Sequence, residues 1–187
     1  MQRALTVPAL ALAAALPLHA QADGWSFLPA TQAGYQADAA LAVLGGLQDP
    51  DVGNVDSDTA YGVEFSLSCP TLTPPRGEIR QQISLTRFDN DGLELTSFEL
   101  NPHYLVDLGS NLSFGVGPGL GYVAADAEGG DSDGVFALQA GASLHYHRGP
   151  LFLGAEARYQ WTQEADLGAA ETDVDNSRFL AKAGVRF

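Results

Sequence analysis

Hydrophobic and polar residues alternate along most of the chain after residue 36, with a period of two rather than the longer period of an amphipathic helix. The pattern is clearest over 111–123, where large residues such as Phe114 and Leu120 alternate with glycines and Ser113. A period of two puts these two sets on opposite faces of a β-strand. The alternating segments predict about eight strands, over 36–47, 60–69, 78–88, 95–107, 111–123, 135–147, 151–162 and 178–187.

Two of these segments are weaker than the others. The segment 36–47 contains little polar alternation, and Gln81 interrupts the apolar face of 78–88. Alternation by itself also fits two architectures. A soluble sandwich turns its apolar face inward, whereas a transmembrane barrel turns that face to lipid and its polar face to the lumen.

Aromatic residues favour the membrane barrel. They lie on the apolar faces, and several are near the end of a predicted strand. These residues are Tyr61, Tyr104, Tyr122, Tyr146, Tyr159, Trp161, Phe179 and Phe187. Amphipathic rings at the two edges of an apolar band form the girdles of a membrane barrel.

The connections between the predicted strands alternate in length and charge. The stretches 48–59, 88–94, 124–134 and 163–177 are mostly long and carry most of the 23 acidic residues. The stretches 70–77, 108–110 and 148–150 are short. Long extracellular loops that alternate with short periplasmic turns are typical of outer-membrane barrels. We therefore predict an all-β, closed, antiparallel up-and-down transmembrane barrel with both ends in the periplasm.

The N-terminus has the three parts of a secretory signal peptide. Arg3 precedes an apolar run from Ala4 to Leu18, and Ala20–Ala22 forms an Ala-x-Ala cleavage site. The run is too short for a membrane-spanning helix, which needs about 20 apolar residues. We expect residues 1–22 to be removed and residues 23–187 to form the barrel.

The last predicted strand ends on an aromatic residue, Phe187, and this tail carries a resemblance. Residues 179–187 resemble the C-terminal signature of bacterial outer-membrane proteins, and 37–187 resemble the small eight-stranded barrels of the OmpA/OmpX and opacity-protein type. The resemblance implies a location in the bacterial outer membrane, surrounded by its lipid. It also implies that the barrel-assembly machinery recognises Phe179, Val185 and Phe187 as an assembly signal.

The inward faces of such a barrel would carry charges of both signs. These residues are Glu64, Arg80, Glu99, Glu156, Arg158, Lys182 and Arg186. The interior of an eight-stranded barrel is just wide enough for side chains to fill it. Because an unpaired buried charge is costly, we expect the residues to pair across the lumen and form a plug. The alternative is a gated path for protons or ions.

Other chemistry finds little support. A net charge of −14 argues against a nucleic-acid partner, and Cys69, the only cysteine, cannot form an intrachain disulfide. His103, His145 and His147 match no zinc spacing. We expect no metal and no cofactor.

Calcium loops and hydrolytic motifs are equally weak. Asp89–Gly92 and Asp131–Gly134 lack the remaining ligands of an EF-hand and suit turns. No Gly-x-Ser-x-Gly motif occurs. Ser143 and His145 share a face that the alternation turns inward.

The sequence predicts a non-enzymatic surface protein with a structural or interaction role and an unspecified extracellular ligand. The alternatives are a lipid-A-modifying barrel enzyme and a narrow ion channel.

Overall fold

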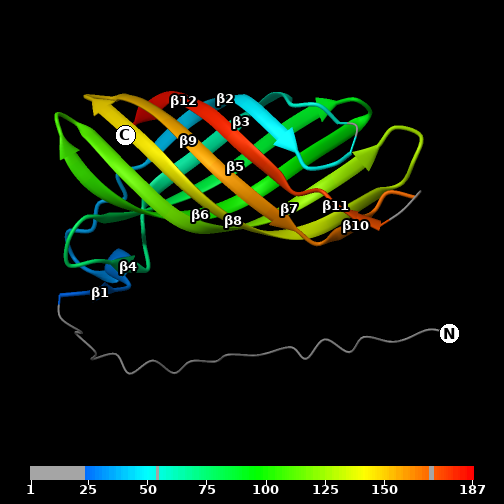
Figure 1. Ribbon diagram of the computed structural model, residues 1–187. Coiled ribbons are helices and arrows are strands. Elements are labelled where there is room, and N and C mark those ends of the chain that lie inside the picture. Colours follow the sequence, from blue (N-terminus) through cyan, green and yellow to red (C-terminus); the bar gives the residue numbers. More distant parts are fainter. Residues whose placement is uncertain (1–23, 54, 169–170) are drawn as a thin grey trace, which may run out of the picture.

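A computed structural model describes residues 24–53, 55–168 and 171–187, so the signal peptide predicted over 1–22 lies outside the described residues. Eight long strands form a closed antiparallel barrel (Figure 1). In chain order they are β2 (Ala40–Pro50), β3 (Asp58–Ser68), β5 (Glu78–Asn90), β6 (Leu93–Gly109), β7 (Leu112–Ala127), β8 (Ser132–Arg148), β9 (Leu151–Thr162) and β12 (Asn176–Arg186). The last strand pairs with the first, from Arg186↔Ala40 to Asn176↔Pro50. The predicted fold class is confirmed.

Short elements extend both ends of the barrel. At the end that carries Phe187, β1 (Ser26–Phe27) pairs with β4 (Leu72–Thr73), and a single turn of 3₁₀ helix covers Pro29–Thr31. At the opposite end, β10 (Glu164–Asp166) pairs with β11 (Glu171–Asp173). No helix among the described residues is long and apolar enough to cross a membrane.

Several predicted boundaries were wrong, mainly because the strands extend further toward the acidic end. The loop expected over 88–94 is a two-residue turn, since Asn90 pairs with Leu93. Asp91 and Gly92 there have φ of 50° and 78°, and positive φ at both central residues is typical of a type I′ hairpin turn. The stretch 70–77 is also more than a turn, because it contains β4.

The start of the first barrel strand also differs from the prediction. The strand was expected from residue 36, but β2 begins at Ala40. Asp38 has a φ of 46°, a left-handed conformation that extended strands do not adopt. The chain therefore turns at Asp38 before it enters the wall.

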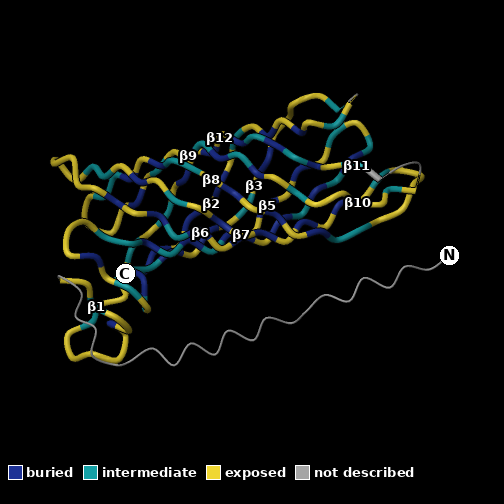
Figure 2. Tube along the Cα trace, turned by 60° about the horizontal axis from the view of Figure 1, so that its bottom comes forward, coloured by how far each residue is buried: buried dark blue, intermediate teal, exposed yellow. Residues whose placement is uncertain are grey.

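In the middle of the wall, apolar side chains face outward and polar ones face inward. On β6, Phe98 and Leu100 are exposed, whereas Glu99 and Asn101 are buried in the lumen. Figure 2 shows this alternation of exposed and buried positions along the strands. Because the outward side chains are large and apolar, they form a belt suited to lipid rather than to water.

Toward the acidic end, the outward face of the wall becomes polar and the inward face becomes apolar. On β6, Glu94 and Thr96 face outward, while Leu93 and Leu95 are buried inside the barrel. Residues from several strands join them in an apolar core within the barrel mouth, including Leu44, Ala60, Phe88, Val123, Ala125, Val135, Ala137, Ala165, Val174 and Leu180. The alternation of the sequence does not predict this core.

Strand length explains the exchange. A strand tilted across a bilayer needs about 9–11 residues, but β6 and β8 have 17 each. The surplus extends past the apolar belt on the acidic side. There the outside of the wall meets water, so its inside holds the apolar residues.

Candidate functional site

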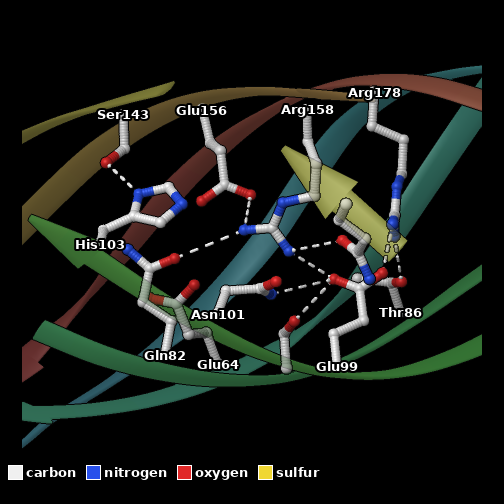
Figure 3. Close-up of polar contacts among 12 residues, drawn as sticks. Glu64, Gln82, Thr86, Glu99, Asn101, His103, Ser143, Glu156, Arg158 and Arg178 are labelled. Atoms are coloured by element: carbon white, nitrogen blue, oxygen red, sulfur yellow. Dashed lines mark hydrogen bonds and ion pairs between the residues drawn. The ribbon is translucent and has the colours of Figure 1, made fainter. Parts of the chain in front are cut away.

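Glu99 lies at the centre of a buried charge network in the lumen (Figure 3). Its Oε2 lies 2.5 Å from Nη1 of Arg158 on β9, and its Oε1 forms an ion pair with Arg178 on β12. Ser84 Oγ donates to Oε2 at 3.1 Å, and Gln160 Nε2 donates to Oε1 at 3.4 Å. The Glu99 side chain is only 1% exposed. Two guanidinium groups therefore compensate one fully buried carboxylate.

A second group of charges adjoins this one. Lys182 Nζ lies 2.5 Å from Glu64 Oε2 and 2.6 Å from Glu156 Oε2. Glu156 also forms an ion pair with Arg158, which joins the two groups. The central network then contains three carboxylates, of Glu64, Glu99 and Glu156, and three cations, of Arg158, Arg178 and Lys182. It is neutral overall and links β3, β6, β9 and β12.

The remaining two predicted lumen charges lie elsewhere, at the end of the lumen near Phe187. Arg80 is buried and lies 3.7 Å from carboxylates of both Asp38 and Glu78. Arg186 pairs with Asp38, and its side chain is 31% exposed. The seven predicted residues are therefore divided between a central network and a separate cluster at the Phe187 end of the lumen.

Arg178 was not among the predicted lumen residues, although it is buried and pairs with Glu99. The signal was present in the sequence. Arg178 has the same parity as Lys182 in the last strand, so a period of two places both side chains on the inward face.

The histidines of the lumen take part in local hydrogen bonds. His103 Nδ1 lies 2.8 Å from Ser143 Oγ, and His145 Nε2 lies 3.3 Å from Gln82 Nε2. All four side chains are buried within the barrel. Across the part of the chain that the structure describes, no group of three or more His, Cys, Asp or Glu side chains could hold a metal ion.

A shallow apolar groove of about 450 Å³ lies on the outside of the barrel across β7, β8, β9 and β12. Its outward side chains are apolar, namely Phe114, Ala142, Leu144, Ala155, Ala157, Phe179 and Ala181. Ser143 and Glu156 also border the groove, but both face the lumen, with 2% and 7% exposure. Neither the Ser143 hydroxyl nor the Glu156 carboxylate is therefore exposed to lipid in the groove.

Four connections make up the acidic rim, namely 48–59, 88–94, 124–134 and 163–177, and their sequences contain no Lys or Arg. Hydrogen bonds join these connections to one another. Asp91 Oδ2 accepts from the backbone N–H of Asp56 at 3.1 Å, and Asp133 Oδ2 accepts from that of Asp166 at 3.0 Å. Backbone N–H groups of Asp166 and Gly134 donate to Asp133 and hold the pKa of its carboxyl below the usual value.

The residues of the predicted assembly signal all face outward. Phe179, Val185 and Phe187 are exposed, and Phe187 is the most exposed at 75%. The backbone N–H of Phe187 donates to Ala39 O at 2.8 Å, which fixes the end of the chain beside the start of β2. Phe179 lies toward the acidic end of β12, away from the other two.

Comparison with known proteins finds likeness in structure alone. No protein-family model matches the chain, and no curated protein matches its sequence. The solved structure of Neisserial surface protein A matches with a TM-score of 0.62 and 16% identity, over 80% of this chain and 97% of that one. Ail, the attachment invasion locus protein of Yersinia pestis, matches with a TM-score of 0.54 and 14% identity, over 82% and 100%.

A third match is the N-terminal β-barrel domain of Pseudomonas aeruginosa OprF, with a TM-score of 0.50 and 14% identity, over 81% of this chain and 100% of that one. All three matched structures are small eight-stranded outer-membrane barrels, which in OprF is the N-terminal domain. At these identities the likeness establishes the fold. The chain has the fold of the small eight-stranded outer-membrane barrels, as the resemblance of its sequence implied.

Proposed function

We propose that this protein is a closed barrel of the bacterial outer membrane that acts at the cell surface through its acidic rim. The outward apolar belt supports insertion of the barrel in lipid, and the fold agrees with a location in the bacterial outer membrane. In this proposal the rim faces the outside of the cell, and Phe187 lies at the periplasmic end of the barrel. The barrel-assembly machinery would act on the outward-facing Phe179, Val185 and Phe187.

The filled lumen is the observation that carries the proposal. The central network is neutral and buried, and the apolar core occupies the mouth beyond it. An ion that crossed this barrel would have to displace both paired charges and packed apolar side chains. The narrow-channel alternative therefore needs a large rearrangement, and function is better assigned to the surface.

The rim favours a partner of positive charge. Its connections carry many carboxylates and no basic residue, and complementary charge speeds association and favours the matching partner. A lipid-modifying enzyme would need reactive groups on the outer wall. The Ser143 hydroxyl and the imidazoles of His103 and His145 face the lumen instead.

Electrical recording tests whether the barrel is closed. Purified protein in a planar lipid bilayer should show no steady conductance. Regular conductance steps from the unmodified protein would replace the proposal with the channel alternative.

Peptide binding tests the role of the rim. A fluorescent oligolysine peptide should bind the protein in nanodiscs, and the affinity should fall with added salt because salt screens exposed charges. The variant Asp56→Asn/Asp91→Asn/Asp131→Asn should weaken binding, whereas Asp107→Asn, at the opposite end, should not. Equal binding by the two variants would contradict a role for the rim.

A further inference from the structure

A small lobe stands outside the barrel at the end that carries Phe187. This lobe, residues 24–37 with 70–77, is held together by the β1–β4 pair and by a hydrogen bond from Leu28 N to Thr71 O of 2.8 Å. In Figures 1 and 2 it lies to one side of the barrel end. Neither the central charge network nor the acidic rim contains residues of this lobe.

The lobe exposes three large apolar side chains that are almost consecutive. Trp25, Phe27 and Leu28 are 37%, 48% and 48% exposed. Leu28 has a φ of 49°, a left-handed conformation that is uncommon for a residue with a side chain. A single exposed apolar residue is ordinary, but a contiguous group of them on a small lobe indicates a surface that something covers.

A hydrogen bond locates the lobe relative to the lipid-facing wall. The hydroxyl of Tyr104 donates to Arg76 O at 3.0 Å. Tyr104 lies on the outward, apolar face of β6, among the aromatic residues near the Phe187 end of the belt. The lobe therefore touches the outer wall within the Phe187-side part of the apolar belt, since Val106 and Leu108 continue the outward apolar face of β6 beyond Tyr104. This part of the belt adjoins the lipid headgroups in a membrane barrel.

The charge of the lobe differs sharply from that of the whole chain. Arg76 is the one charged residue of 24–37 and 70–77, whereas the chain has a net charge of −14. Tryptophan is enriched at the interface between membrane and water, where one part of its ring is apolar and its N–H is solvated. A segment with exposed Trp, Phe and Leu, one Arg and no acidic residue matches that interface.

We propose that the lobe binds the surface of the phospholipid bilayer on the periplasmic side, with Trp25, Phe27 and Leu28 in the headgroup layer. The inference rests on the proposed function, since it requires the barrel to span a membrane. It assigns the lobe a partner of one kind, the leaflet that surrounds the barrel at that end.

Tryptophan fluorescence tests the proposal, because Trp25 and Trp161 are the two tryptophans of the chain. Trp161 faces outward in the belt at the other end of the barrel. The variants Trp161→Phe and Trp25→Phe each leave one of the two. Each is refolded into phosphatidylcholine vesicles whose acyl chains carry bromine near the headgroup. The bromines should quench Trp25 to an extent comparable with Trp161.

Variants within the lobe provide the control. In the Trp161→Phe background, Phe27→Ser/Leu28→Ser should reduce the quenching of Trp25 by bromine and increase its quenching by aqueous iodide. Ala30→Ser/Ala33→Ser, which changes exposed residues of the same segment, should leave both unchanged.

Three outcomes would overturn the proposal. If bromine quenches Trp161 but only iodide quenches Trp25, the lobe projects into water while the barrel spans the bilayer. If neither quencher reaches Trp25, protein covers the lobe, from a second copy or another partner. If bromine does not quench Trp161 either, the barrel is not inserted, and the proposed function fails together with this inference.

Discussion

Glu99 is a charged residue in a fully buried position. A carboxylate in a closed lumen loses its hydration, and ion pairs with Arg158 and Arg178 offset that loss. Removing one member of such a network costs more stability than the network adds, because the remaining charges stay buried without a partner. We therefore expect the network to specify strand positions rather than to add much stability.

Glu99→Ala should lower the free energy of unfolding by about 3–5 kcal/mol, the usual loss when a buried ion pair is broken. Urea unfolding, followed by the heat-modifiable gel migration of the folded barrel, would measure it. Glu94→Ala is the matched control on the same strand, since it breaks an exposed pair with Arg87 of 2.7 Å. That loss should stay below about 1 kcal/mol. Equal losses in the two variants would show that the network is hydrated and weakly coupled.

At this scale the sequence predicts the direction of each side chain but not its partner. A period of two was enough to turn Glu64, Glu99 and Lys182 inward. Whether Lys182 pairs with Glu64 or with Asp38 depends on the stagger between strands that are far apart in the chain. The alternation within one strand carries no information about that stagger. For the same reason Arg80 and Arg186 were grouped with charges that they do not reach.

Strand β6 shows that a single strand can meet two solvents. Its middle places Leu100 outward against lipid, and its acidic end places Leu95 inward against the apolar core. Period-two alternation continues through both parts, but the polar and apolar faces are exchanged between them. The prediction began this strand two residues too late, at 95 rather than 93, and ended the next strand four residues too early, at 123 rather than 127. The acidic residues there suggested a loop, although they are outward residues of strands that extend into water.

A pair of lysine substitutions on β6 tests this change of solvent. Leu100→Lys should cost about 2–4 kcal/mol, because it places a cation on the lipid face well inside the belt. Thr96→Lys, four residues closer to the rim and also outward, should cost about 0–1 kcal/mol. Refolding yield and urea unfolding in vesicles would compare them. If both lysines were tolerated equally, the belt would not be in lipid.

The glycines of β7 make room for the polar lumen. A Cβ built at Gly119 would lie 2.9 Å from Asn101 Cγ and 3.3 Å from Gln139 Cβ. Gly119→Val should therefore destabilise the barrel by about 1–3 kcal/mol through overpacking. At Gly45 on β2, an added Cβ meets nothing within 4 Å, so Gly45→Val should leave the urea midpoint nearly unchanged. A similar loss at both positions would indicate a general effect of removing strand glycines instead of a filled lumen.

For the molecule as a whole, the sequence predicts much more of the architecture than of the site. Eight strands, their connections and the two faces of the wall follow from local alternation and from the spacing of acidic stretches. Closure by β12 and β2 could be expected because an unpaired strand edge is unfavourable in a membrane. The apolar core inside the mouth could not, since it unites residues of many strands with loop residues such as Val52 and Leu167.

The orientation of the barrel decides which of its ends can meet an extracellular partner, and the two ends of β8 provide the test. Ser132 is exposed within the acidic rim, and Arg148 is exposed at the turn near Phe187. In a Cys69→Ser background, Ser132→Cys should react with a membrane-impermeant maleimide on intact cells, and Arg148→Cys should react only after the outer membrane is permeabilised. Both exposed thiols should react in detergent, which controls for reactivity. Labelling of Arg148→Cys alone on intact cells would reverse the orientation, place the acidic rim in the periplasm and remove it as a cell-surface site.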